Sequence, residues 1–250
     1  MSTGAVPVPS EPDPAPAYPM RLDGELDPGV SRGLWLIKWL LALPHIVILV
    51  FLWIAVFFVS VIAFFAILFT GRYPRGLFDF TAGVLRWSWR VGYYAYSVAG
   101  TDRYPPFSLA EDDAYPARFA VDYPEHLSRG LVLVKWWLLA IPQYAIVGVL
   151  LGSSTAVYNH SAGRTTVVRS PSLIAILVLI AVVALLFTGR YPDGLFRFVM
   201  GLQRWVFRVG VYALLLRDEY PPFRLDAGGT DPGTAELPPA PPGHDPAASW

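Results

Sequence analysis

The sequence predicts an all-α integral membrane protein built from two tandem repeats. A long apolar tract, an internal duplication and a segregation of charge support this class. The tract, residues 46–69, has no charge, no proline and no glycine. More than about 18 consecutive apolar residues are typical of a bilayer segment, because a helix satisfies its own backbone polar groups without water. We therefore expect each repeat to be a transmembrane helical hairpin followed by an amphipathic interfacial helix, with short β-strands in cytoplasmic segments.

The chain repeats its motifs in the same order. The matching pairs are Ser31-Arg-Gly-Leu34 with Ser128-Arg-Gly-Leu131, Lys38-Trp39 with Lys135-Trp136, Phe69-Thr-Gly-Arg-Tyr-Pro74 with Phe187-Thr-Gly-Arg-Tyr-Pro192, and Tyr104-Pro-Pro-Phe107 with Tyr220-Pro-Pro-Phe223. So many ordered matches indicate a duplicated unit of about 100 residues. The predicted domains are a disordered proline-rich tail (1–17), membrane repeat one (18–114), membrane repeat two (115–225) and a disordered acidic, proline-rich tail (226–250).

The spacing of the matches locates an insertion in the second copy. Matches lie 97 or 98 residues apart up to Pro142, 118 apart from Phe187 to Gly210 and 116 apart at Tyr220, and the extra residues are the polar stretch 153–170. Aligned with copy one, this stretch falls beside Trp53, inside the apolar tract. A polar insertion is tolerated at the tip of a helical hairpin but not deep in hydrocarbon.

We therefore expect helical arms at about 34–52 and 54–70 in copy one, and at about 131–151 and 171–188 in copy two. A single crossing by residues 46–69 stays open as the alternative. That alternative is kept because the first hairpin has no glycine or proline at its turn and its arms are barely long enough for a hydrocarbon core of about 30 Å.

An aromatic amphipathic helix is predicted after each apolar region, at about 75–98 and 193–215. In the first, apolar residues recur at spacings of three or four, while Arg86 and Arg90 lie on the other face. Helices of this kind lie on a membrane surface. The pieces Tyr-Pro-x-Arg and Tyr-Pro-Pro-Phe, two of each, are expected to be extended and to pair into a small cytoplasmic sheet.

Charge predicts the orientation of the protein. The chain has 19 basic and 19 acidic residues, but 18 of the basic and only 10 of the acidic residues lie between Ser31 and Leu225. A basic membrane-bound core suits anionic lipid head groups. The positive-inside rule makes the arginine-rich side cytoplasmic. We expect a multi-pass protein of a bacterial plasma membrane with both termini in the cytoplasm; the preference for arginine over lysine, seventeen to two, indicates a bacterial source.

These motifs resemble a known family. The Ser-Arg-Gly-Leu, Lys-Trp and Phe-Thr-Gly-Arg-Tyr-Pro elements are similar to those of a bacterial membrane-protein family catalogued as domain of unknown function 4389, over about residues 18–225. The resemblance implies a duplicated membrane unit and no particular mechanism. The polar stretch 153–170 departs from the pattern. Gln143 stands where copy one has His45, which argues against a shared histidine ligand or base.

The Phe-Thr-Gly-Arg-Tyr-Pro motif has two interpretations. In the first it is a helix exit, in which Gly71 and Gly189 take a positive φ as C-caps. In the second its arginines and tyrosines bind lipid phosphate or a polyanionic partner; these residues are Arg72, Tyr73, Arg190 and Tyr191. The two interpretations are compatible.

Three further sets of residues are candidates. The pairs Arg86/Arg90 and Arg204/Arg208, each spaced i, i+4, are predicted to lie on a solvated face over head groups or to bind anionic lipid or a partner. Interface anchors are predicted at Lys38, Trp39, Lys135 and Trp136, with both lysines extending to the interface. Asp102 and Asp218, the acids that recur between copies, are expected to pair with a nearby arginine.

The chain shows no pattern typical of an enzyme. It has no cysteine, its four histidines lack metal-ligand spacing, and no nucleophile elbow or nucleotide-binding loop is present. We predict no catalytic residue, no metal, no cofactor and no nucleic-acid partner. The favoured function is a non-enzymatic accessory or scaffold protein whose basic cytoplasmic face contacts anionic lipids, a membrane-protein partner or a second copy. The alternative is a subunit of an oligomeric transporter or channel, since duplication is common in transporters.

Overall fold

The computed structural model describes residues 18–159 and 163–225. The chain divides into two units. Met1–Tyr18 with Ala227–Trp250 lies outside the described residues except for Tyr18, and so do the disordered tails predicted at 1–17 and 226–250. Pro19–Asp226 carries the described helices and strands. These are β1 (Met20–Gly24), α1 (Trp35–Leu41), α2 (Leu43–Thr70), α3 (Arg75–Ala95), β2 (Ala117–Val121), α4 (Leu131–Val134), the π-helical turn η1 (Lys135–Leu139), α5 (Ile141–Leu151), β3 (Ser153–Asn159), β4 (Arg164–Ser170), α6 (Leu173–Thr188) and α7 (Asp193–Ala213).

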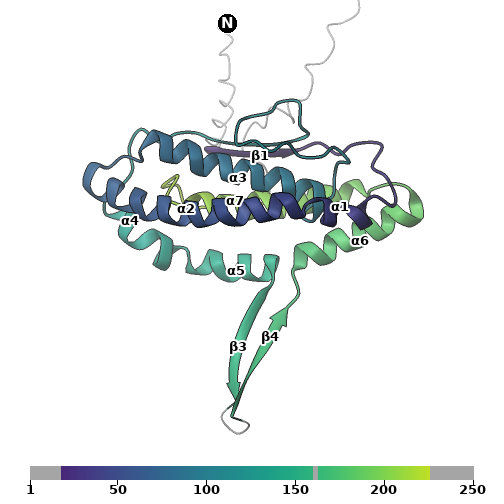
Figure 1. Ribbon diagram of the computed structural model, residues 1–250. Helices are drawn as coiled ribbons and strands as arrows, with labels where there is room; N and C mark the ends of the chain where they lie inside the picture. Colours follow the sequence, from purple (N-terminus) through teal and green to yellow (C-terminus); the bar gives the residue numbers. More distant parts are fainter. Residues whose placement is uncertain (1–17, 160–162, 226–250) are drawn as a thin grey trace, which may run out of the picture. The chain divides into compact units, whose positions relative to one another are not determined.

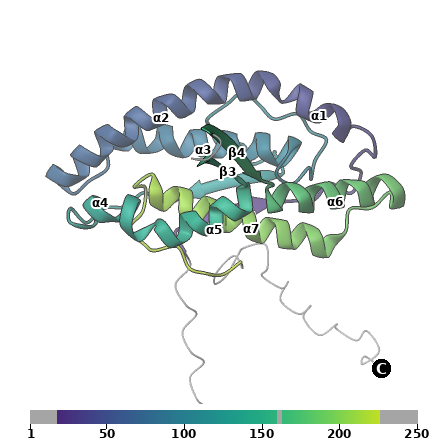
Figure 2. The ribbon, with the colours of Figure 1, turned by 90° about the horizontal axis from the view of Figure 1, so that it is seen from below.

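Both copies follow one plan: a strand, then apolar helices, then an amphipathic helix. In copy one the apolar part is α1 and the long α2; in copy two it is α4, η1, α5 and α6. Figures 1 and 2 show α2, α3, α5, α6 and α7 running along one common direction, with α5 and α6 following one another where copy one has the single rod of α2. The predicted mostly helical, duplicated architecture is therefore observed.

The helical hairpin predicted for copy one is wrong. Residues 43–70 form one unbroken helix, so the arms at 34–52 and 54–70 do not exist. Trp53, the predicted tip, lies inside α2, and its Nε1–H donates a hydrogen bond of 3.1 Å to Ser88 Oγ of α3. The tract has no residue that would end a helix, and α2 packs along α3, so nothing interrupts it.

Copy two is divided where the sequence places the insertion. Two apolar segments, 131–151 and 173–188, flank it, as predicted. The first bends by 43° between η1 and α5. The insertion forms an antiparallel hairpin, β3–β4, in register from Ser153↔Ser170 to Asn159↔Arg164. In Figure 1 this hairpin projects away from β1, at right angles to the helices.

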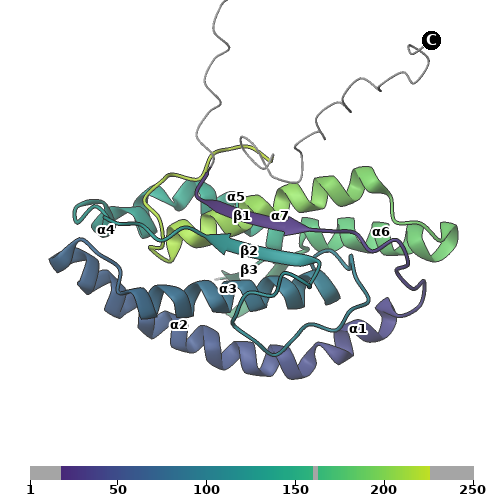
Figure 3. The ribbon, with the colours of Figure 1, turned by 90° about the horizontal axis from the view of Figure 1, so that it is seen from above.

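A two-stranded ribbon, β1–β2, joins the copies through their Tyr-Pro-x-Arg segments. It is antiparallel, and Leu22 pairs with Phe119. Both of these side chains are 2% exposed and point inward. The ribbon lies over α3 and α7 (Figure 3). Pairing of these two segments confirms half of the predicted sheet; the Tyr-Pro-Pro-Phe segments are not strands, because prolines supply no backbone N–H.

Apolar side chains are exposed along α1, α2, α4, η1, α5 and α6, which we call the apolar layer. Only 17% of the most apolar 18-residue window of α2 is buried. Large exposed side chains of the layer include Leu36, Trp39, Val47, Phe51, Phe57, Phe65, Phe69, Trp136, Trp137, Val149, Leu179, Ile180 and Phe187. The helix α2 is the one described helix long and apolar enough to cross a membrane by itself.

The amphipathic helices α3 and α7 match the predicted spans 75–98 and 193–215 closely, but they are not surface helices. They lie between the ribbon and the apolar layer, and 13 of the 21 residues of α3 are buried. The sequence showed their periodicity correctly. It did not show that the ribbon and the segments after each helix would cover the polar face.

Candidate functional site

Each Phe-Thr-Gly-Arg-Tyr-Pro segment is a helix-exit corner, as predicted. Gly71 ends α2 with φ +71°, and Gly189 ends α6 with φ +73°. The N–H of each glycine donates a hydrogen bond of 2.8 Å to a carbonyl four residues earlier. This left-handed conformation favours glycine because a Cβ would crowd the following carbonyl. The next helix then begins directly after Pro74 or Pro192.

The tyrosines of the two corners are buried, which corrects their predicted role as lipid contacts. Tyr73 is 0% exposed and its hydroxyl lies 3.4 Å from Thr81 Oγ1. Tyr191 is 7% exposed and donates a hydrogen bond of 2.9 Å to the carbonyl oxygen of Val98, in the other copy. Burial raises the pKa of both hydroxyls. The two buried tyrosine side chains therefore attach the corners to the protein interior.

The arginines of the corners are exposed, and each corner also receives an arginine from the other copy. Arg129 packs against Gly71, so that a Cβ added at Gly71 would lie 3.4 Å from its Nε. Arg32 packs against Gly189 so closely that an added Cβ would overlap its guanidinium. We define corner one as Arg72, Arg75 and Arg129 around Gly71. Corner two is Arg32 and Arg190 around Gly189.

The two corners lie far apart. Figure 2 shows the C-terminal ends of α2 and α6 at opposite ends of the helices. The 28 residues of α2 span about 42 Å at 1.5 Å per residue. Sequence reasoning missed Arg32 and Arg129 as corner residues, although the recurrence of Ser-Arg-Gly-Leu in both copies was a signal that the motif has a common role.

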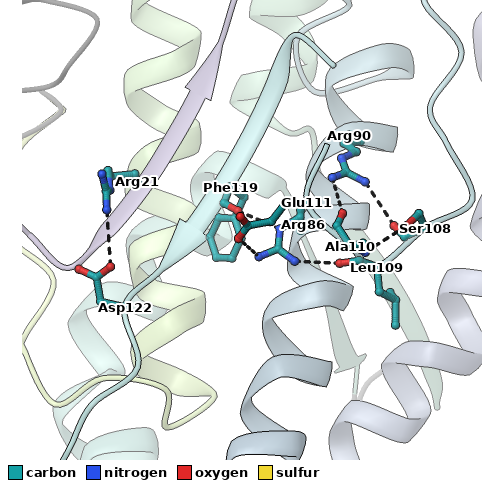
Figure 4. Close-up of polar contacts among 9 residues, drawn as sticks. All are labelled: Arg21, Arg86, Arg90, Ser108, Leu109, Ala110, Glu111, Phe119 and Asp122. Carbon is teal, nitrogen blue, oxygen red and sulfur yellow. Dashed lines mark hydrogen bonds and ion pairs between the residues drawn. The ribbon is translucent and has the colours of Figure 1, made fainter. Parts of the chain in front are cut away.

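The arginine pairs of α3 and α7 do not form an open basic face. Arg86 donates from Nε to the carbonyl of Phe119 at 3.1 Å and from Nη1 to that of Leu109 at 2.8 Å (Figure 4). Its Nη2 lies 2.7 Å from Glu111. Arg90, 1% exposed, donates to the carbonyls of Ser108 and Ala110.

Copy two repeats this arrangement. Arg204 donates from Nε to the carbonyl of Leu22 at 3.0 Å, and Arg208, 1% exposed, donates from Nη1 to that of Arg224 at 2.9 Å. The prediction of a solvated, lipid-contacting face at these four arginines is therefore corrected. Instead, Arg86 of copy one binds β2 of copy two, and Arg204 of copy two binds β1 of copy one.

The lysines predicted as interface anchors are buried. Lys38 is 0% and Lys135 1% exposed, and each ammonium lies 2.7 Å from a carboxylate, of Asp102 and Asp218 respectively. The recurring acids thus pair with lysine, which corrects the predicted pairing with arginine. Trp39 and Trp136 are 58% and 47% exposed, a position compatible with the anchor role predicted for them.

Each of these carboxylates also accepts a backbone hydrogen bond of 2.6 Å at its second oxygen, from Ser31 N–H or Ser128 N–H. Burial by itself would raise the pKa of Asp102, but the hydrogen bonds from Lys38 and Ser31 outweigh it, so the pKa lies below its ordinary value. In copy one, the ion pair fixes α1, and the bond from Ser31 fixes the segment before α1, to the segment after α3.

The difference between His45 and Gln143 has a structural explanation. Trp87 Nε1–H donates to His45 Nδ1 at 3.1 Å, and in copy two Trp205 Nε1–H donates to Gln143 Oε1 at 2.7 Å. Both residues accept an indole hydrogen bond at the same place in the repeat. His45 also stacks on Phe107, with ring centroids 3.9 Å apart.

Among residues 18–159 and 163–225, no three His, Asp or Glu side chains are grouped as metal ligands would be. An apolar cleft of about 720 Å³ lies between α2, α3 and α7, with Trp53, Trp89 and Phe207 in its walls. The described arrangement therefore offers exposed cations at two corners and an extended apolar surface.

The fold and these sites define a mostly helical, internally duplicated protein that carries a long, exposed apolar helix. The chain belongs to the family described as Domain of unknown function (DUF4389), whose model matches residues 32–108 and 170–224. Two matched segments are what a duplicated unit predicts, and the second begins at the last residue of the β3–β4 hairpin. No curated protein and no solved structure matches the chain.

Proposed function

We propose that the chain is a non-enzymatic accessory or scaffold protein bound to a bacterial plasma membrane. The apolar layer lies in the cytoplasmic leaflet and the β1–β2 ribbon faces the cytoplasm. The observation that carries this proposal is the exposure of large apolar side chains along the whole layer. Water-soluble proteins rarely expose contiguous apolar patches above a few hundred Å². Burying one Leu or Phe side chain stabilises by roughly 1.5–3 kcal/mol, so immersion of this layer is strongly favoured.

The charges of the ribbon favour helices that lie along the membrane and do not cross it. Arg21 pairs with Asp122, and Arg118 with Glu25, and all four side chains are exposed. If α2 stood along the bilayer normal, the ribbon, which runs beside it, would enter the hydrocarbon with these charges. Charged side chains at that depth are costly. With α2 parallel to the surface, the ribbon stays in water, and the polar element that enters the bilayer is the β3–β4 hairpin, with Arg164 and Arg169.

The corners support the choice of leaflet. Arg32, Arg72, Arg129 and Arg190 are exposed at the ends of the helices. With the helices parallel to the membrane, both corners meet the head groups of one leaflet. The positive-inside rule and the anionic lipids of the cytoplasmic leaflet favour that side. The apolar cleft between α2 and α7 then faces lipid chains, which can fill it.

Single-cysteine labelling tests the orientation, because the chain contains no native cysteine. Gly76 and Gly194 occupy equivalent positions just after the two corners, and a Cβ at either meets nothing within 4 Å. In vesicles, Gly76→Cys and Gly194→Cys should react with a membrane-impermeant maleimide from the same side. Reaction from opposite sides would show that the helices cross the membrane and would sink the proposal.

The alternative function, a subunit of an oligomeric channel, is favoured by the β3–β4 hairpin. It is a two-stranded sheet whose outer edges pair with no other described strand. Its seven-residue strands extend about 23 Å at 3.3 Å per residue. In hydrocarbon such edges need a partner, and neighbouring copies could supply one by closing a ring of hairpins.

A flux assay separates the two functions. Vesicles containing the full chain are loaded with a small dye, and a variant in which residues 154–169 are replaced by a short glycine–serine linker is the matched control. The scaffold proposal expects equal retention of dye by both. Leakage through the full chain that disappears in the shortened variant would favour the channel.

A further inference from the structure

We infer that each corner binds the phosphate of an anionic lipid head group, through arginines supplied by both copies of the repeat. Corner one uses Arg72 and Arg129, with Arg75 beside them; corner two uses Arg190 and Arg32. The inference rests on the proposed function, because immersion of the apolar layer is what places the corners at the head groups.

The first observation is that four exposed arginines of the corners form no ion pair in the part of the chain that the structure describes. Within the described residues, Arg72 and Arg129 form no ion pair, and the same holds for Arg32 and Arg190. By contrast, the less exposed cations Lys38 and Arg86 each lie 2.7 Å from a carboxylate. The corners are therefore suited to an anion from outside the chain.

The second observation is that corner one collects positive charge from both copies and from a helix start. Arg129 packs on Gly71, the neighbour of Arg72 in the chain. Arg75 begins α3, and the start of a helix carries a positive partial charge that disfavours a cation. It forms an ion pair with Glu125 at 3.7 Å, and that carboxylate is largely exposed. An anion at the corner would add a favourable partner for this positive charge.

The third observation identifies the source of the anion as a lipid. Phe69 and Phe187 stand two residues before Gly71 and Gly189, and they are 72% and 79% exposed, the highest values among the large apolar side chains described. Each corner thus places an exposed phenyl ring on the apolar layer next to exposed guanidinium groups. An acyl chain and its phosphate match this pair, and a guanidinium binds phosphate oxygens in a bidentate manner.

The two corners differ in charge. Where corner one has Arg75 at the start of α3, corner two has Asp193 at the start of α7. Corner one therefore carries more positive charge. We expect it to bind an anionic lipid more tightly than corner two.

Native mass spectrometry of the detergent-solubilised full chain, titrated with phosphatidylglycerol or phosphatidylcholine, tests the inference. The wild type should bind two phosphatidylglycerol molecules with unequal affinity and should prefer them to phosphatidylcholine. Arg72→Gln/Arg129→Gln should weaken the tighter site about tenfold, as expected when charge-assisted hydrogen bonds to one phosphate are lost. Arg32→Gln/Arg190→Gln should weaken the other site.

The matched control is Arg21→Gln/Arg118→Gln, which removes two exposed charges from the ribbon and should leave both lipids bound. If a corner variant fails to fold, Arg72→Gln alone replaces it, since no side-chain contact of Arg72 within the protein is described. Inorganic phosphate should not displace the lipid, because it cannot contact Phe69. Unchanged lipid binding by the corner variants, equal loss by the control, or displacement by phosphate would each overturn the inference.

Flotation with neutral phosphatidylcholine vesicles distinguishes failure of the inference about the corners from failure of the proposed function. If the chain floats with neutral vesicles while its corner variants keep full phosphatidylglycerol binding, the inference about the corners is wrong and the proposed function is unaffected. A chain that does not float contradicts the proposed function and the inference with it.

Discussion

At the residue scale, the buried cations of this protein depend on their partners. Lys38 and Lys135 are each held by a carboxylate and a backbone carbonyl, of Thr101 and of Arg217. A buried ion pair contributes little over an apolar pair of the same shape, but removal of one partner leaves a desolvated charge. Mutation of one partner should therefore destabilise the protein more than mutation of both.

We predict that Asp102→Asn lowers the free energy of unfolding by about 3 kcal/mol, because Lys38 is left buried without its counter-charge. The double variant Lys38→Met/Asp102→Asn should be less destabilised than Asp102→Asn. Denaturation in detergent micelles, followed by tryptophan fluorescence, measures both. Glu111→Gln, which removes an exposed carboxylate, is the control and should change stability by less than about 1 kcal/mol.

The pH dependence of the stability difference between wild type and Asp102→Asn follows from the lowered pKa of Asp102. The stabilisation is complete above the ordinary value of 3.8 and is lost as the pH falls through the lower value of the folded state. The gap between wild type and Asp102→Asn should therefore stay constant from pH 7 to about pH 5 and close below about pH 4. A gap that closes near neutral pH would contradict the assignment.

His45 gives a second prediction at this scale. Because Gln143 accepts the equivalent indole hydrogen bond in copy two, His45→Gln should keep the acceptor for Trp87. His45→Leu should leave the buried indole N–H unsatisfied, at a cost of about 1–3 kcal/mol. Thermal unfolding of the two variants in the same detergent compares them. Equal stability of both would show that the hydrogen bond is not needed.

At the scale of elements, the corners depend on left-handed glycines. Gly71→Ala should destabilise by about 1–2 kcal/mol, because alanine is strained at this φ and its Cβ would meet Arg129. Gly189→Ala should cost about the same, since the guanidinium of Arg32 that lies where the new Cβ would be is the flexible end of an exposed side chain and can move aside. Gly76→Ala, in the first turn of α3 with open space around it, is the control and should be neutral or stabilising. Melting temperatures in detergent would rank the three.

At the scale of the whole Pro19–Asp226 unit, the copies are interlocked. Arg86 of copy one holds β2 of copy two, and Arg204 of copy two holds β1 of copy one. Each corner is completed by an arginine of the other copy. Each copy is therefore a unit of the sequence, but it does not form a complete core by itself.

We predict that residues 18–114 and 115–225 do not fold separately. Each half expressed alone should be cleaved rapidly by protease in detergent, because its ribbon strand and corner lack partners. Co-expression of both halves should restore resistance. A half that is resistant by itself would show that the interlocking contacts are dispensable.

The sequence by itself determined the duplication, the family, the apolar tract, the two amphipathic helices, the place of the insertion and the glycine corners. Each of these follows from local composition or from spacing along the chain. Only the tertiary structure decided that residues 43–70 form one helix, that Lys38 and Arg90 are buried, and that Arg129 completes a corner of the other copy. These depend on contacts between segments distant in sequence, and neither hydropathy nor periodicity shows which neighbour will cover a charged side chain.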